Sequence, residues 1–505
     1  MRDCFYCFLL FSAMLTGLTS CKNKLEKSAR IFIHFPEAAG DTVIIGSTNM
    51  ISLEGTELAK VRLDSAGKGV LEVEVNEPVF TYINNGKNMA ASLLIAPGDD
   101  CEILAAEPGA GFPLHFAGDG AAVNQALNEC QQLRSAFDKW NGTYSFQLEG
   151  NVFLQARDSL QKSYDQLIGK LKVSNDVTAE KLDLLKRHAA MHIIFYQYNF
   201  ALGKDSSEIP QSVWHVVNQF PVDTIALKAG IFDYGMIASF YYNNKINNAI
   251  YEENNGLDED TLQANFPLLV EEKIKAAHYP KIIENFLRVK SAHIQIGWSG
   301  LTPELRKLTK KLEQEISSAG AKSVIREDVA RWEKLGPGKP APDFSGMTPD
   351  SKRLALSDLR GKVVYVDVWA TWCGPCVGAF PDSRKLQAKF KGNNRIAFLY
   401  VSIDRDTLAW QKMVVSGKVP AGHHMLNGPD EAGSVWNLYH LRGVPHYLLI
   451  DDLGRMVATH APHPSASHTA EELQSLLAAA VARSENQPRM RRIKGMPATA
   501  KNSAW

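Results

Sequence analysis

Two cysteines three residues apart are the side chains in this sequence best suited to chemistry. They occur in Trp372-Cys373-Gly374-Pro375-Cys376, where an apolar run gives way to a helical pattern. At a helix start, this spacing places both thiols on one face about a turn apart, close enough to form a disulfide. Unpaired backbone N–H groups and the helix dipole stabilise a thiolate at the first position. We therefore expect Cys373 to be an accessible nucleophile and Cys376 to resolve its mixed disulfide by thiol-disulfide exchange.

Other uses of a cysteine pair fit the sequence less well. A tetrahedral zinc site needs two further ligands, and Cys101 and Cys130 are not closely spaced. Val377 stands where a haem-attachment motif needs histidine. A purely structural disulfide is the remaining alternative, although exposed placement at a helix N-terminus favours lability. We expect no metal and no cofactor other than the redox-active disulfide Cys373–Cys376.

A carboxylate precedes the cysteines within the strand-like run Val363–Val368. An aspartate desolvated inside a strand has a raised pKa, which suits Asp367 to take the proton of Cys376 through a water. The alternative is an aspartate at a strand end that caps nearby N–H groups.

Two tryptophans lie near the cysteines in the sequence. Trp372 offers an apolar rim for an extended substrate, whereas Trp369 is expected to fill the core.

The composition describes a multidomain globular protein. The chain has 505 residues, 45% of them apolar and 22% charged, which predicts two to four domains. Lysine plus arginine and aspartate plus glutamate each number 55, so no overall field draws the chain to nucleic acid. Seven cysteines are too few for a scaffold built on disulfides.

The first 21 residues read as an export signal. Cys4–Leu18 is apolar but shorter than the roughly 20 residues that a transmembrane helix needs. Leu18-Thr19-Ser20-Cys21 resembles the bacterial lipobox, which implies signal cleavage and lipid attachment at Cys21; a plain secretory signal is the alternative. The residues after Cys21 carry no retention aspartate, so we expect an outer-membrane lipoprotein facing the periplasm. That compartment permits disulfides.

The patterning predicts three domains and a tail. Short alternating strands over 22–120, joined by turns that include a hairpin-like turn at Pro97–Asp100, indicate an antiparallel β-sandwich. Three- and four-residue apolar spacing over 121–334 indicates a helical domain, with helices at 125–140, 153–171, 179–199, 268–278, 281–291 and 303–317.

After the proline- and glycine-rich segment at 335–342, alternating strands and helices up to 484 predict an α/β fold with a largely parallel first half, including a helix over Glu431–Tyr439. Residues 485–505 are basic and lack an apolar period; they are expected to be disordered, with contact to lipid headgroups as the alternative.

Trp369–Cys376 matches the thioredoxin-superfamily signature, and 335–483 resembles the TlpA/ResA branch of membrane-associated thiol-disulfide oxidoreductases. The resemblance implies a thioredoxin-like fold and a cis-proline at Pro445 beside the active-site disulfide. It also implies a helix kink at Pro381 and makes Asp367 the buried acid of thioredoxins. The β domain resembles, loosely, a domain of unknown function that often precedes thioredoxin modules in such lipoproteins.

The sequence departs from the family at two positions. Ala379 stands where relatives usually carry a glutamate, and Tyr400 stands where thioredoxins place a lysine beside their acid.

His446 either stabilises the Cys373 thiolate or lines the substrate groove. The residues expected to bind substrate are Trp372, Gly374, Pro375, Val444 and His446.

Other cysteines and histidines leave alternatives open. Cys101 and Cys130 either pair with each other or remain buried free thiols. His423-His424 and the pair His460 and His463 admit a metal interpretation, but solvated loop histidines are the expectation.

Together these features predict an envelope enzyme that exchanges, and most readily reduces, disulfides of periplasmic proteins. Its partners would be those proteins, a membrane or periplasmic dithiol donor and, through a lipid anchor, the membrane, with no nucleic acid. One alternative is a peroxiredoxin-like peroxide reductase, since Pro340–Phe344 also resembles that group. Another is a periplasmic binding or scaffold protein with an accessory redox domain.

Overall fold

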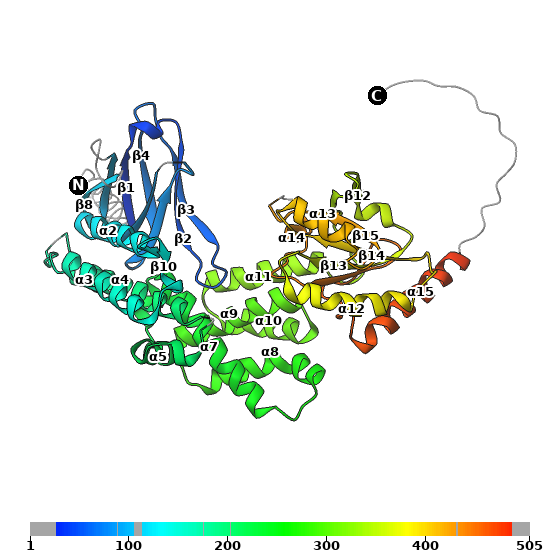
Figure 1. Ribbon diagram of the computed structural model, residues 1–505. Helices are drawn as coiled ribbons and strands as arrows, with labels where there is room; N and C mark the ends of the chain where they lie inside the picture. Colours follow the sequence, from blue (N-terminus) through cyan, green and yellow to red (C-terminus); the bar gives the residue numbers. More distant parts are fainter. Residues whose placement is uncertain are drawn as a thin grey trace, which may run out of the picture. The chain divides into compact units, whose positions relative to one another are not determined.

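The structure, a computed structural model, describes residues 27–486 except for 88, 106–113, 175, 203 and 431–432. Two compact units divide this part of the chain (Figure 1). The first contains the described residues up to His293 together with Lys310–Ile325, and the second contains Ile294–Thr309 and the described residues from Arg326 onward. Cys21 and the tail beyond Asn486 lie outside the described residues.

Two four-stranded sheets build the β domain of the first unit, and their apolar residues share one core. One sheet has the order β4-β1-β7-β8 and the other β3-β2-β5-β6. The strands are β1 Ser28–His34, β2 Thr42–Thr48, β3 Gly55–Arg62, β4 Lys68–Glu74, β5 Val79–Asn84, β6 Ala90–Ile95, β7 Asp100–Ala105 and β8 Leu114–Gly118.

The expectation of a purely antiparallel sandwich was wrong at one pairing. β1 and β7 are parallel, with Ile31 opposite Cys101. The turn before β7 is not a hairpin, because it carries the chain from β6 in one sheet to β7 in the other. β7 therefore enters its sheet beside β1 in the same direction.

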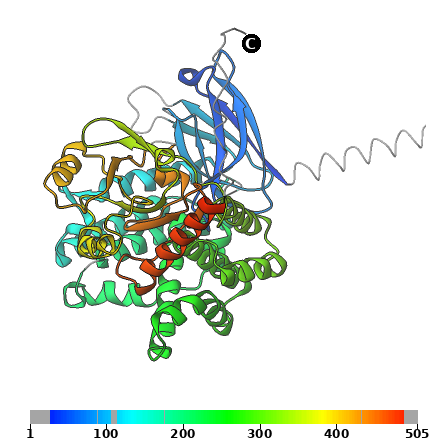
Figure 2. The same cartoon turned by 90° about the vertical axis from the view of Figure 1, so that its right-hand side faces the viewer.

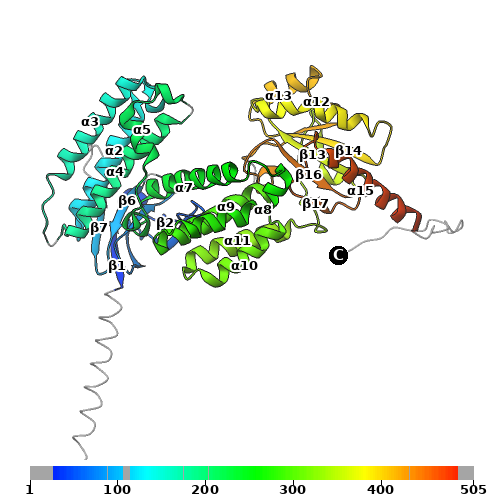
Figure 3. The ribbon, with the colours of Figure 1, turned by 90° about the horizontal axis from the view of Figure 1, so that it is seen from below.

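Helices form the rest of the first unit. α2 contacts β6 and β8, and α2, α3, α4 and α5 pack against one another (Figure 3). α7 and α11 were not predicted. The helices are α2 Ala121–Asp138, α3 Gly150–Ile168, α4 Ala179–Ala201, α5 Gln211–Asn218, α6 Thr224–Lys228, α7 Phe232–Glu253, α8 Glu259–Ala276, α9 Lys281–Ser299, α10 Pro303–Glu315 and α11 Ala319–Lys334, with a two-strand ribbon of β9 Lys139–Trp140 and β10 Thr143–Tyr144. The division between units falls within α9, α10 and α11.

A seven-stranded sheet organises the second unit, in the order β12-β11-β15-β14-β13-β16-β17. β13, β14 and β15 are parallel, β16 pairs antiparallel with β13, and β17 pairs antiparallel with β16. The strands are β11 Ser345–Met347, β12 Arg353–Ala355, β13 Val363–Trp369, β14 Ile396–Ser402, β15 His423–Leu426, β16 His446–Ile450 and β17 Met456–Ala458. Every residue of β13 is buried, as its continuous apolar run predicts.

Two helices, α12 (Gly374–Ala388) and α15 (Ser467–Asn486), share one core with this sheet. Figure 2 shows α15, in red, lying against the strands. Tyr365 of β13 packs in that core with Leu386 of α12 and Leu473 of α15. The remaining helices are α13 Thr407–Val415 and α14 Val435–Leu438. α14 is shorter than expected because Ser434 caps its N-terminus, its side chain accepting a hydrogen bond from the N–H of Asn437.

Candidate active site

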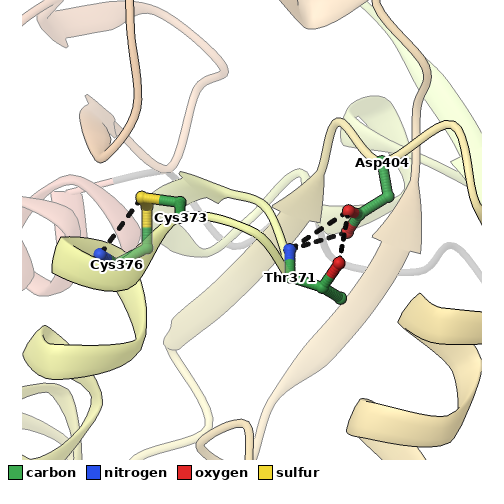
Figure 4. Close-up of a disulfide and its surroundings, with 4 residues drawn as sticks. All are labelled: Thr371, Cys373, Cys376 and Asp404. Carbon is green, nitrogen blue, oxygen red and sulfur yellow. Dashed lines mark hydrogen bonds between the residues drawn. A yellow bond between two sulfur atoms is a disulfide. The ribbon is translucent and has the colours of Figure 1, made fainter. Parts of the chain in front are cut away.

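Cys373 is the N-cap residue of α12, directly before the helix and at the end of the loop that follows β13. It has an extended backbone conformation, and its Sγ accepts a hydrogen bond from the N–H of Cys376 at 3.2 Å (Figure 4). Gly374 and Pro375 occupy the first two helical positions, where proline suits the helix because its missing N–H would have no partner there. The helix start thus directs a backbone donor at the sulfur of Cys373, as the sequence predicted.

The two cysteines form a disulfide, with their Cα atoms 5.3 Å apart. Cys373 is 5% exposed and Cys376 is 1% exposed. The expectation of an exposed nucleophile was therefore wrong for the oxidised state. In this state the sulfur of Cys373 is bonded to the sulfur of Cys376 and accepts a hydrogen bond from the N–H of Cys376. Its neighbour Trp372 is 67% exposed, and its role as an apolar rim for the substrate stays a prediction.

A second carboxylate, Asp404, anchors the loop before the nucleophile and was not identified from the sequence. Both of its oxygens accept from the N–H of Thr371, at 3.0 and 3.1 Å, and the hydroxyl of Thr371 donates to it at 2.7 Å (Figure 4). The hydroxyl of Ser402 donates a further bond at 2.6 Å. One signal was available: parallel β13 and β14 end together, with Trp369 opposite Ser402, so a polar residue just after β14 faces this loop.

Asp367 lies in the middle of β13, between Tyr400 of β14 and Tyr447 of β16 in the register of the sheet. It is 2% exposed, and neither carboxylate oxygen has a hydrogen-bond partner among the described residues. Burial raises the pKa of Asp367 to about 8. The alternative of a capping aspartate was wrong, because capping would require an N–H partner.

The face of β13 that carries Asp367 also carries the expected core tryptophan. Trp369 is fully buried, and its ring meets that of Phe380 edge-on at 5.3 Å. Phe380 lies one turn beyond Cys376 on α12, so the first turns of this helix cover the strand face beside Asp367. Pro381 lies inside the same helix.

The peptide bond between Val444 and Pro445 is cis, as the family resemblance implied. His446 follows it at the start of β16, and its Nε2 lies 2.7 Å from the carbonyl oxygen of Thr459. Burial lowers the pKa of His446 to about 4, so the imidazole is neutral at pH 7. Val444, Pro445 and His446 are each half-buried, and their place in a substrate groove stays a prediction.

Two pairs of histidines admitted a metal interpretation from the sequence. Among the described residues, no group of three or more potential ligands is close enough to hold a metal ion. His423 and His424 were expected in a solvated loop but lie in β15, where His424 stacks on Tyr400 with ring centroids 5.4 Å apart. Burial lowers the pKa of His424 to about 4.

Cys101 and Cys130 are free thiols, both fully buried, and this selects one of the two alternatives left open by the sequence. Cys101 lies in β7 and Cys130 in α2. Burial raises the pKa of each thiol to about 12.

Within the described part of the chain, no helix has the length and apolar character needed to cross a membrane.

Comparison with known proteins places the second unit in a family. A family model described as Redoxin matches residues 336–477. The thiol-disulfide oxidoreductase ResA of Bacillus cereus is 27% identical over 144 residues, covering 28% of this chain and 79% of the relative. A Bacteroides vulgatus protein provisionally assigned as a thiol-disulfide oxidoreductase is 34% identical, covering 28% of this chain and 98% of its own, with a TM-score of 0.26. The thioredoxin domain of another thiol-disulfide oxidoreductase from Bacteroides vulgatus is 27% identical, covering 28% and 97%, with a TM-score of 0.25.

A sheet of this topology, with a dithiol at the start of the helix after its central strand, defines a thioredoxin-like thiol-disulfide oxidoreductase. The C-terminal region of this chain belongs to the thioredoxin superfamily, in its TlpA/ResA-like branch. Residues 1–335 lie outside the Redoxin match, so the sandwich and most of the helices are additions to this enzyme domain.

Proposed function

We propose that this protein reduces disulfides of protein substrates in the cell envelope, using Cys373 and Cys376 as its redox-active dithiol. The observation that carries this proposal is the disulfide at the start of α12, in which the sulfur of Cys373 accepts a hydrogen bond from the N–H of Cys376. The same N–H can stabilise a thiolate after reduction, which makes Cys373 the attacking sulfur.

The reaction is an exchange of two disulfides. The Cys373 thiolate attacks one sulfur of the substrate disulfide, forming a mixed disulfide and releasing the other substrate sulfur as a thiolate. The Cys376 thiolate then attacks the Sγ of Cys373, re-forms the Cys373–Cys376 bond and releases the second substrate thiolate. Two electrons pass from the dithiol to the substrate, and the released thiolates take up protons. A dithiol donor in the envelope returns the two electrons to the enzyme.

Asp367 is the proposed acceptor of the Cys376 proton. It lies unpaired beneath the first turns of α12, and its raised pKa places its titration near pH 8. A bridging water carries the proton between thiol and carboxylate. In the reverse direction, the protonated carboxyl returns the proton to the leaving Cys376 sulfur. Resolution of the mixed disulfide is therefore expected to accelerate as the pH approaches 8.

The proposed location and direction rest on sequence features. The apolar leader and the lipobox-like segment ending at Cys21 support export and lipid anchoring on the periplasmic face of the outer membrane. Gly374-Pro375 between the cysteines resembles reducing thioredoxins and supports net reduction. ResA and the interchange proteins among the relatives are named for the same exchange of thiols and disulfides.

The decisive experiment compares Cys373→Ser with the unaltered protein in an insulin reduction assay. We expect the variant to lose all measurable activity, while Cys101→Ala and Cys130→Ala, as matched controls, retain it. Cys376→Ala should instead accumulate mixed disulfides, and their substrates can be identified by mass spectrometry. Full activity of Cys373→Ser would contradict the proposal, and consumption of hydrogen peroxide without insulin reduction would favour the peroxide reductase.

A further inference from the structure

α9 begins in the first unit and continues into the second, which starts at Ile294 in this helix. Its last turn carries an exposed tryptophan, Trp298. Trp298 is 60% exposed although it lies outside the residues matched by the Redoxin family model. It belongs to the same compact unit as the dithiol. An indole this exposed, held against the enzyme domain, can serve as an anchor for a partner.

Trp298 contacts the segment that carries the cis-proline. A methyl group placed on Gly443 would lie 3.1 Å from Cη2 and 3.2 Å from Cζ3 of the Trp298 ring, so the indole lies directly against the Gly443 backbone. Gly443 is two residues before Pro445. A glycine at this position thus allows the close approach of a residue that the enzyme domain itself does not supply.

Further contacts hold the end of α9 in place. A methyl group on Gly297 would lie 3.3 Å from Nε of Arg442, and Gly300, with φ of +70°, approaches the side chains of Thr459 and His460. His460 also packs against Trp332 of α11, with ring centroids 5.2 Å apart, and against His446 at 4.6 Å. The end of α9 therefore lies against Arg442 and Gly443, just before the cis-proline, and against His460, which packs on His446 just after it.

The strand register brings this tryptophan and the dithiol to the same edge of the sheet. β13 and β16 are antiparallel neighbours, with Val368 opposite His446. The loop that leaves β13 carries Trp372 and Cys373, and the segment that enters β16 carries Gly443 and Pro445. The two segments therefore lie next to each other at the end of β13 and the start of β16; the first contains the exposed Trp372, and the exposed Trp298 lies against the second.

We propose that Trp298 and Trp372 form two apolar contacts for the polypeptide around the target disulfide. Together they select protein substrates with an aromatic or large aliphatic side chain beside the cystine. This inference rests on the proposed function, since it names the substrates of that reaction. Trp298 is a specificity-determining residue rather than a catalytic one, because it contacts the polypeptide and not the reacting sulfurs.

The test uses the full chain and three disulfides: a cystine peptide flanked by phenylalanine, the same peptide flanked by serine, and 2-hydroxyethyl disulfide. We expect the unaltered protein to prefer the phenylalanine peptide about tenfold in kcat/KM, the usual size for one aromatic anchor. Trp298→Ala should lose that preference through a higher KM, whereas Trp298→Phe keeps most of it. Turnover of 2-hydroxyethyl disulfide should stay unchanged. Trp214→Ala, which removes a tryptophan 45% exposed in the first unit, is the matched control.

The outcomes separate this inference from the proposed function. If Trp298→Ala keeps the preference for phenylalanine, or if its activity falls equally on all three disulfides, the specificity role is overturned while disulfide reduction stands. If the unaltered protein reduces none of the three, the proposed function fails, and the specificity role fails with it.

Discussion

The two units of this protein each contain a pair of cysteines, and the comparison shows what makes a thiol reactive. Cys101 and Cys130 in the first unit are fully buried, but Cys373 and Cys376 in the second are nearly as inaccessible. Exposure therefore does not distinguish the pairs. The difference lies in the surroundings of the sulfur atoms. Cys373 accepts a hydrogen bond from a backbone N–H at 3.2 Å, whereas Cys101 accepts one from the side-chain amide of Asn124 at 3.9 Å.

The difference between the two pairs follows from how their surroundings stabilise a thiolate. Desolvation disfavours the thiolate and raises the pKa of Cys101 and Cys130 to about 12, and the long hydrogen bond from Asn124 to Cys101 does not offset it. At the start of α12, unpaired N–H groups and the helix dipole oppose that cost. A reactive thiol can thus be kept nearly out of solvent, provided that a helix terminus stabilises its charge.

The largest expected effect is the difference in alkylation rate between the two pairs. At pH 7 a thiol with a pKa near 12 is ionised to about one part in 10⁵, whereas thiols at helix starts are often about half ionised. After reduction of the folded protein, Cys373 should react with iodoacetamide at least about 1,000-fold faster than Cys101 or Cys130. Peptide mass spectrometry measures each rate.

Denatured protein serves as the control for alkylation, because all four cysteines should then react at similar rates. Comparable rates in the folded protein would remove the distinction between the pairs, and with it the claim that the helix start sets reactivity.

The second effect concerns the proton acceptor. Asp367→Asn should slow resolution of the mixed disulfide about tenfold to a hundredfold at pH 8 and abolish its rise with pH, because no carboxylate remains to accept the Cys376 proton. Stopped-flow fluorescence from pH 6 to 9 measures this step. Asp350→Asn, which alters an exposed carboxylate in the same unit, is the control.

The pH dependence of the free energy of unfolding tests the ionisation of Asp367 independently. Because the folded pKa of Asp367 lies near 8 and an unfolded aspartate titrates near 4, the folded state binds the proton more tightly, and stability falls as the pH rises through this window. Asp367→Asn should remove that loss, which amounts to at most about 5 kcal/mol. Hydrogen exchange of β13 at pH 5 and pH 8 measures it. An identical pH dependence in both proteins would show that Asp367 does not titrate in this range.

The sequence was sufficient for features that depend on local chemistry. The dithiol at a helix start and the apolar run of β13 each occupy a few consecutive residues, whereas the cis-proline was expected only from the family resemblance. Features that depend on distant partners were missed. Asp404 was overlooked because its partner Thr371 lies 33 residues away, and the parallel pairing of β1 with β7 depends on how the chain crosses between sheets.

Two further misses have local causes. α7 was not predicted because its apolar residues alternate with asparagines and aromatic residues of low helix propensity, and no single polar face emerges. β15 begins with His423-His424, which read as a loop because neither residue is typical of a buried strand. Packing against Tyr400 supplies the stabilisation that the local sequence lacks.

The third effect tests the anchor of the active-site loop. Asp404→Ala removes the acceptor of three hydrogen bonds from Thr371 and one from Ser402, and should destabilise the second unit by roughly 2–4 kcal/mol and lower insulin reduction about fivefold. Thr371→Val keeps the N–H donor and loses only the hydroxyl, so its effects should be intermediate. Hydrogen exchange at 370–373 with parallel activity assays measures both. Unaltered exchange in Asp404→Ala would exclude an anchoring role.

The smallest effect is expected at His446, and it decides between the two roles considered for this residue. A charged imidazole near Cys373 would lower the thiol pKa, but burial keeps His446 neutral at pH 7. His446→Gln should therefore shift the Cys373 pKa by less than about 0.3, measured from the pH dependence of alkylation. A neutral buried histidine must gain a proton on unfolding below pH 6.5, so stability falls as the pH drops from there toward 4, and His446→Gln should lose that part of the dependence. A larger shift of the thiol pKa would mean that the imidazole is charged in the reduced enzyme and that a side chain, as well as the helix start, stabilises the thiolate.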